Sequence, residues 1–256
     1  MNRQNWEAAG GSDQGNHRTY NEDSFCFRTA MAGGHWAGLM AVADGVGSLG
    51  HGAEASRMLV EQILAWWKQE LPWLAETGRE PGAEVLAEHL EAALREANRK
   101  ILAYGRSQCF QLATTASVLL LFQGRYLVLH VGDSRIYRVE GKMPHRLRQL
   151  TEDQVCQVER TVEGRRVRKS VLTDCLGYRE TFRIWRQEGT LEKGDLFLAC
   201  SDGLYRTWEP EALRRRIWKG RRNLEELSES LIREARLAGE TDNISLAVLR
   251  IGEPGK

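Results

Sequence analysis

Six carboxylates stand beside apolar runs of the chain, where the ends of β-strands would place them together. Three aspartates follow such runs, while one glutamate and two aspartates precede them. They are Asp44, Asp133 and Asp202 after the runs, and Glu22, Asp23 and Asp242 before them. Because the end of one antiparallel strand lies beside the start of its neighbour, all six side chains can gather at one rim.

So many carboxylates in one place repel one another, and some must take up protons unless cations compensate them. Oxygen ligands without Cys or paired His favour Mg²⁺ or Mn²⁺ over Zn²⁺. Gly45 and Gly203, directly after Asp44 and Asp202, let the backbone turn and bring a carbonyl within reach of an ion. Two ions about 3.5–4 Å apart can activate a water for displacement at phosphorus. The pattern predicts a metal-dependent phosphatase, although Asp-Gly after a strand is also ordinary turn chemistry.

Arg18 is the cation that fits such a site. Its planar guanidinium can hold two phosphate oxygens at once. The alternative is a surface arginine in a polar N-terminal loop, because the sequence around it is polar throughout.

Two long helices and one shorter helix are expected from the spacing of apolar residues. The long helices cover Ala53–Leu71 and Glu84–Gly105, and the turn Glu76–Gly82 between them contains Gly and Pro. The third helix covers Leu224–Leu237. The first two therefore predict a helical hairpin that packs on a flat layer.

That layer is built from β-strands, which come in hairpins rather than between helices. The link Gln123-Gly124-Arg125 indicates one hairpin turn. We expect antiparallel sheets with helices laid on them rather than a parallel doubly wound sheet. The predicted strands are Ser24–Arg28, Trp36–Ala43, Thr114–Phe122, Tyr126–Val131, Ile136–Val139, Phe182–Gln187, Asp195–Cys200 and Asn243–Ile251.

Composition limits the class of protein. Of 256 residues, 42% are hydrophobic and 28% charged, which suits a folded chain with a substantial core. The net charge of +1 argues against a nucleic-acid partner. No apolar run approaches the length of a membrane span, and the N-terminus lacks the apolar segment of a secretory signal. We therefore expect one domain over residues 1–256, with no membrane partner and a monomer as the default.

The five cysteines are scattered and odd in number, which is typical of reduced thiols in the cytoplasm. Two basic clusters, Glu163–Lys169 and Leu213–Arg222, are interpreted as a solvated loop and a solvated helix face. The alternative is that they dock an acidic or phosphorylated partner.

Five motifs, in register along nearly the whole chain, resemble those of the metal-dependent (PPM, type 2C) Ser/Thr protein phosphatases, above all the compact bacterial members. They are Ser12–Asp23, Val42–Gly47 with its Asp-Gly pair, Val131–Arg135 with Gly-Asp-Ser-Arg, Cys200–Leu204 and Thr241–Ile244. The resemblance implies an α+β fold, a four-layer α-β-β-α sandwich of two antiparallel sheets flanked by paired helices.

The resemblance also implies roles for the metal ligands. Asp44 would bridge two Mn²⁺ or Mg²⁺ ions, and the Gly45 carbonyl would bind one of them. Asp202 and Asp242 would complete the second site. Asp133 would join Asp202 at a third, weaker ion.

Other residues would act around those ions. Glu22 would act through metal-bound water, and Asp23 is expected as a structural hydrogen-bond partner rather than a ligand. Arg18 would grip the substrate phosphate, so Arg18 joins Asp44 and Asp202 as the residues expected to carry catalysis.

Two features depart from the family pattern or are not diagnostic. Where some members have a His directly after Asp-Gly, this chain has Val46, and its His51 lies further on. A role for His51 as substrate contact or general acid is weighed against a role in the loop before a helix. Residues 151–176 align with the mobile flap of bacterial members and are expected to tune substrate choice.

The implied function is hydrolysis of phosphoserine and phosphothreonine in proteins, by direct attack of a hydroxide held between the two ions. The implied partner is a Ser/Thr kinase whose targets this enzyme resets in bacterial signalling. One alternative is a catalytically silent protein of the same fold that binds a partner. Another is a phosphodiesterase or nucleotidase that uses the same kind of metal site.

Overall fold

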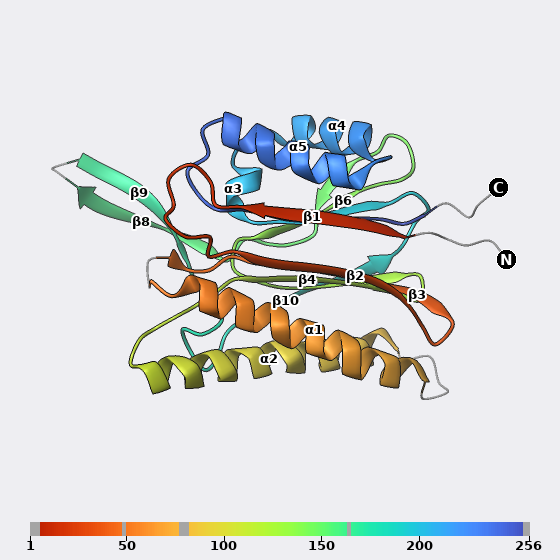
Figure 1. Ribbon diagram of the computed structural model, residues 1–256, viewed down its shortest axis with the longest axis horizontal. Helices are drawn as coiled ribbons and strands as arrows, with labels where there is room; N and C mark the ends of the chain where they lie inside the picture. The colour runs from red at the N-terminus through yellow and green to blue at the C-terminus, as the bar shows by residue number, and fades with distance from the viewer. Residues whose placement is uncertain (1–5, 48–49, 77–81, 163–164, 253–256) are drawn as a thin grey trace.

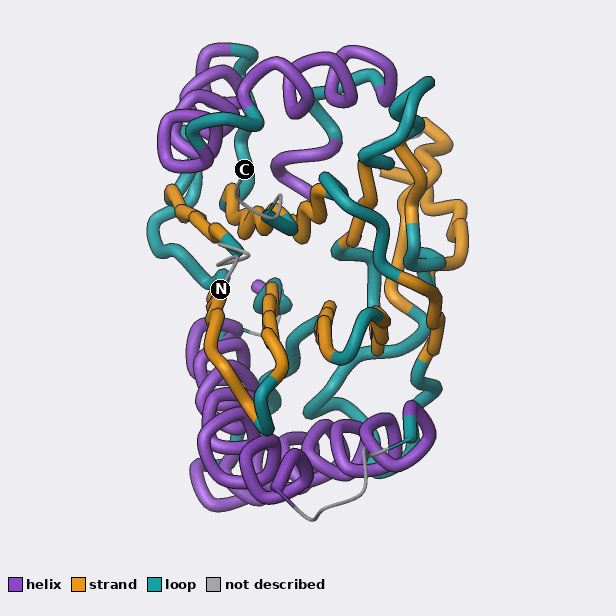
Figure 2. The backbone as a smooth tube through the Cα atoms, turned by 90° about the vertical axis from the view of Figure 1, so that its right-hand side faces the viewer, coloured by secondary structure: helices purple, strands orange, loops and turns teal. Residues whose placement is uncertain are grey.

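A computed structural model describes residues 6–47, 50–76, 82–162 and 165–252. Two five-stranded antiparallel sheets lie face to face between two layers of helices (Figures 1 and 2). The first sheet has the order β1-β12-β11-β6-β7 and the second the order β10-β5-β4-β3-β2. The predicted fold class, two antiparallel sheets flanked by paired helices, is therefore confirmed.

The strands of the first sheet are β1 (Glu7–Asp13), β6 (Arg135–Val139), β7 (Leu147–Gln149), β11 (Leu196–Cys200) and β12 (Ile244–Arg250). Those of the second are β2 (Ser24–Ala32), β3 (His35–Ala43), β4 (Ala116–Phe122), β5 (Arg125–Val131) and β10 (Trp185–Thr190). A separate hairpin of β8 (Val155–Val162) and β9 (Arg165–Leu172) projects from the body (Figure 1).

Helices cover the outer face of each sheet. The helices α1 (Gly52–Glu76) and α2 (Ala83–Gln108) lie on the second sheet. The helices α3 (Asp202–Tyr205), α4 (Pro210–Gly220) and α5 (Leu224–Leu237) lie on the first. At the start of α5 the Asn223 side chain accepts a hydrogen bond from the Glu226 N–H, which satisfies one of the free donors of that helix end.

The central strands are buried on both faces, and apolar residues therefore predominate in them. In β12, Leu246 and Val248 pack under the helices, whereas Ala247 and Leu249 face the other sheet. Three apolar layers result, one between the sheets and one beneath each pair of long helices. Burial on both faces fixes the register of these strands, since a slip by one residue exchanges the two faces.

Most predicted elements are confirmed, and the differences have local causes. All three predicted helices are present, and α5 has the predicted bounds. The predicted strand at Phe182–Gln187 is wrong at its start, because β10 begins at Trp185. The strand β1 was missed because its sequence, EAAGGSD, contains no large apolar residue. Most of the turn Glu76–Gly82 lies outside the described residues.

The second basic cluster, Leu213–Arg222, begins within α4, and three of its arginines have acidic neighbours. Arg214 lies 2.6 Å from Glu211 on the same helix, and Arg216 lies 2.9 Å from Glu234 on α5. These ion pairs favour the interpretation as a solvated helix face. No helix among the described residues is long and apolar enough to cross a membrane.

Asp195 provides a test of what holds the first sheet together. Its side chain is fully buried and lies 2.6 Å from Arg138 on β6, and it also accepts hydrogen bonds from the Gly141 and Glu192 N–H groups. Asp195→Ala leaves a buried arginine without its partner, so we expect a loss of about 3–5 kcal/mol in the free energy of unfolding, measured by urea denaturation. Glu211→Ala breaks an exposed pair and should cost less than about 1 kcal/mol. Equal losses in the two variants would contradict this account.

Candidate metal centre

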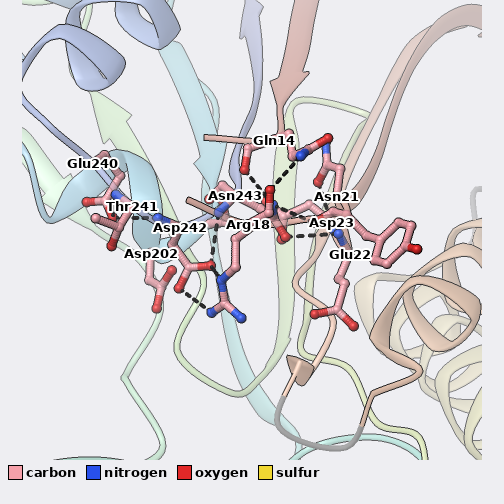
Figure 3. Close-up of polar contacts among 12 residues, drawn as sticks. Gln14, Arg18, Asn21, Glu22, Asp23, Asp202, Glu240, Thr241, Asp242 and Asn243 are labelled. Carbon is pink, nitrogen blue, oxygen red and sulfur yellow. Dashed lines mark hydrogen bonds and ion pairs between the residues drawn. The ribbon is translucent and has the colours of Figure 1, made fainter. Parts of the chain in front are cut away.

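The predicted carboxylates meet at one end of the sandwich. Asp44 and Asp133 follow β3 and β5, and Asp202 opens α3, separated by one residue from the end of β11. Asp242 precedes β12, and Asp23 precedes β2. Several of these residues, together with Arg18 and Asn243, are drawn in Figure 3. Their common position follows from the antiparallel pairing, in which strand ends and strand starts alternate along one rim.

Asp44 stands at the electrostatic centre of this group. Burial raises its pKa well above the ordinary value, and the negative charges of Asp23, Asp202, Asp133 and Asp242 raise it further. The repulsion expected from the sequence is therefore present in the fold. Protonation or cations must relieve it.

The backbone of Asp44 is held from two sides. Its N–H donates to the Thr115 hydroxyl at 2.9 Å, and its carbonyl accepts from the Thr115 N–H at 2.9 Å. The next residue, Gly45, donates its N–H to the Glu22 carbonyl at 3.2 Å. A Cβ on Gly45 would lie 2.5 Å from that carbonyl oxygen, so only glycine fits.

Three more carboxyl groups have pKa values above the ordinary range. Burial raises the pKa of Asp202 to about 7 and that of Asp23 to about 6, and it also raises the pKa of Asp133. The Oδ1 atom of Asp202 is buried without a hydrogen-bond partner. Asp23 lies beside the hydroxyls of Ser201 and Ser245, but neither of its oxygens makes a well-formed hydrogen bond.

Two arginines reach into the group. Arg18 holds Asp242 with one edge of its guanidinium, from Nη2 to Oδ2 at 2.9 Å and from Nε to Oδ1 at 2.8 Å (Figure 3). Arg206, one turn after Asp202, lies 2.5 Å from Asp202 Oδ2 and 3.9 Å from Asp242 Oδ2. Sequence reasoning singled out Arg18 but missed Arg206, because no motif surrounds it.

Asn243 is a second residue that sequence reasoning did not single out, although it lies within the Thr241–Ile244 motif. Its Oδ1 accepts from the Glu22 N–H at 2.9 Å, and its Nδ2 donates to the carbonyls of Gln14 and Tyr20 at 2.8 and 3.1 Å. It thus fastens the N-terminal loop that carries Arg18 to the strand that follows Asp242 (Figure 3).

Glu22 and His51 lie near the start of α1. The Glu22 carboxylate accepts the Gly52 N–H at 3.0 Å, which suits a negative charge at a helix N-terminus. The His51 ring stacks on Phe110, with ring centroids 3.7 Å apart, and lies 4.0 Å from Glu54. These neighbours are not the clustered aspartates, so a role for His51 in substrate binding stays a prediction.

The donor set fits hard divalent cations. The oxygens belong to carboxylates, they are partly buried, and some have no partner. Among the described residues, however, no three His, Cys, Asp or Glu side chains already converge on one point. Arg18 holds both oxygens of Asp242, and Arg206 holds Oδ2 of Asp202. Asp242 would therefore have to turn away from Arg18 to bind an ion.

Comparison with known proteins agrees with this arrangement. The model of the family described as Protein phosphatase 2C matches residues 11–238. The serine/threonine phosphatase stp of Listeria monocytogenes is 30% identical over 253 residues, which cover 93% of each chain. The crystal structure of the serine/threonine phosphatase PstP/Ppp of Mycobacterium tuberculosis superposes with a TM-score of 0.74 at 26% identity, over 97% of this chain and 99% of that one.

A structure of the catalytic domain of PstP in complex with two manganese ions is also similar. It has a TM-score of 0.72 at 26% identity and covers 97% of this chain and 99% of that one.

The raised pKa values predict how the metal-free protein responds to pH. Asp202 and Asp23, with pKa values of about 7 and 6, bind protons in the native state that they release in the unfolded state. Stability without divalent ions should therefore fall as pH rises from 5 to 8, by about 2–4 °C in melting temperature for each kcal/mol. Thermal denaturation in EDTA measures this.

The Asp44→Asn variant tests whether charge repulsion causes this pH dependence, because it removes the central charge and keeps the shape of the side chain. It should raise the melting temperature in EDTA at pH 8 and have little effect at pH 5. If the metal-free stability of the wild-type protein did not change over this pH range, the aspartates would not repel one another in the native state as described here.

Proposed function

The chain belongs to the protein phosphatase 2C family, and from this premise we propose how it acts as a metal-dependent protein serine/threonine phosphatase. The observation that carries the proposal is the placement of five aspartates at the strand ends of one rim of the sandwich, close enough that the charges of Asp23, Asp202, Asp133 and Asp242 raise the pKa of Asp44. A folded protein tolerates such repulsion where cations or a function require it.

Five residues of this chain would hold the ions. Asp44 would lie between two of them, the Gly45 carbonyl would bind one, and Asp202 and Asp242 would bind the other, with Asp133 beside them. Mn²⁺ or Mg²⁺, when bound, lowers the pKa of water so that it becomes a nucleophile near neutral pH, and offsets charge on the phosphoryl group. The unpaired Oδ1 of Asp202 supports its part in this set.

Arg18 would orient the substrate. Its guanidinium now holds the two oxygens of Asp242, a planar pair whose spacing resembles that of two phosphate oxygens. If Asp242 instead held an ion, the same edge of the Arg18 guanidinium would be free to hold the phosphate. Glu22 would contribute negative charge beside the ions, from a position fixed by Gly52 and Asn243.

The substrate would be a phosphorylated protein segment, and the opposing enzyme a Ser/Thr kinase. The β8–β9 hairpin, within the predicted flap 151–176, starts next to the site. Here the Gln154 N–H donates to the Gly132 carbonyl at 2.7 Å, one residue before Asp133. Arg166, Arg168 and Lys169 are exposed on the hairpin, so its charge suits acidic residues around a phosphosite.

The surroundings of the thiols support a cytoplasmic location. All five cysteines are free, and burial raises the pKa of Cys26 to about 12 and of Cys175 to about 11. Five unpaired thiols suit a reducing compartment. We expect the protein to work there as a monomer within one domain over residues 1–256.

Metal dependence is tested with a phosphothreonine peptide. We expect phosphate release with Mn²⁺ or Mg²⁺ and none in EDTA. Asp44→Ala and Asp202→Ala should each lower the activity by more than about 10²-fold, while the circular dichroism spectrum stays unchanged. Substantial metal-dependent turnover in either variant would contradict the ligand assignment. Faster cleavage of a phosphodiester than of the peptide would favour a phosphodiesterase instead.

Arg18→Ala should separate substrate binding from metal binding. Loss of a bidentate, charge-assisted contact costs about 1.5–3 kcal/mol, so kcat/KM should fall about 10- to 100-fold, mainly through KM. Mn²⁺ binding, measured by calorimetry, should persist, because Arg18 supplies no ligand. An unchanged KM would exclude Arg18 from the phosphate site.

A further inference from the structure

Arg206 is a cation built into the carboxylate cluster. It lies at the end of the short helix α3, one turn after Asp202, and its backbone N–H donates to the Asp202 carbonyl at 3.0 Å. Its Nη2 lies 2.5 Å from Asp202 Oδ2, and its Nη1 lies 3.9 Å from Asp242 Oδ2. The Asp202 side chain is only 10% exposed and that of Arg206 is 48% exposed, so the ion pair joins a buried carboxylate to a half-exposed guanidinium at the mouth of the site.

The ion pair makes the two oxygens of Asp202 unequal. Oδ2 is engaged by Arg206, whereas Oδ1 is buried and has no partner. A carboxylate held in this way presents one defined oxygen to an ion, just as residues behind a metal ligand commonly fix its orientation. Arg206 therefore positions Asp202.

The charge of Arg206 also acts on Asp133. Apart from burial, which raises the pKa of Asp133, Arg206 has the largest effect on that group and lowers its pKa. In turn, burial disfavours the charge of Arg206, but Asp202, Asp133 and Asp242 stabilise it and leave its pKa raised. The guanidinium thus lies in the field of the two carboxylates, Asp133 and Asp202, that would hold a third ion.

The balance of charge leaves no need for that ion. The cluster contains six carboxylates, counting Glu22, and two guanidinium groups, Arg18 and Arg206. When all are ionised the net charge is −4, which two divalent ions neutralise. A third ion would add two positive charges beside an arginine.

We propose that Arg206 is an internal counter-ion that takes the place of a third divalent ion beside Asp133 and Asp202, so that this protein binds two ions. The proposal rests on the metal-dependent function proposed above. It predicts that removal of the guanidinium, rather than any change in the carboxylates, creates a further cation site.

The experiment counts Mn²⁺ per chain in the full-length protein, by equilibrium dialysis with elemental analysis and by calorimetry. We expect two equivalents in the wild type and a third, weaker equivalent in Arg206→Gln. Arg206→Lys keeps the positive charge and should stay at two. The control Arg214→Gln, which breaks an exposed arginine–glutamate pair on α4, should also stay at two.

A double variant identifies where the third ion binds. Asp133→Asn combined with Arg206→Gln should return to two equivalents, and circular dichroism and melting curves verify that each variant is folded. Three ions in the wild type, or two or fewer in Arg206→Gln, would overturn the proposal. A wild-type protein that binds no Mn²⁺ would instead overturn the metal-dependent function itself, and with it this inference.

Discussion

Mutual repulsion of carboxylates at one rim is the constraint on which the rest of this structure depends. Asp44 and its neighbours are half-buried or buried, so their charges act on one another more strongly than in water. A loop with few contacts would relieve the strain by moving its side chains into solvent. Here the groups stay together because they are attached to the ends of strands that cannot move independently.

The rigidity comes from burial on both faces of the central strands. The strands β3, β11 and β12 each contribute to the layer between the sheets and to a layer under helices. Shifting one of them would disturb two apolar layers at once. The favourable free energy of this packing offsets the unfavourable electrostatics at the rim, so stability and function reside at different places in the same sheets.

Arginines moderate the repulsion without removing it. Arg18 engages both oxygens of Asp242 and Arg206 engages Oδ2 of Asp202, whereas Asp202 Oδ1 stays unpaired. The site therefore holds partial compensation of its own and retains negative charge for divalent ions. Asn243 adds a neutral link that keeps the Arg18 loop in place without further charge.

The sequence by itself determined the class of fold and the members of the carboxylate group. Apolar runs such as Trp36–Ala43 indicate strands, and the acidic residues at the ends of these runs can be recognised without coordinates. Only the tertiary structure decided which cations meet those carboxylates. The role of Asn243 depends on side-chain contacts with the N-terminal loop, which is far away in the chain. The role of Arg206 depends on the direction of the short helix α3. The strand β1 likewise owes its existence to pairing with β12, because its own residues have little preference for a strand.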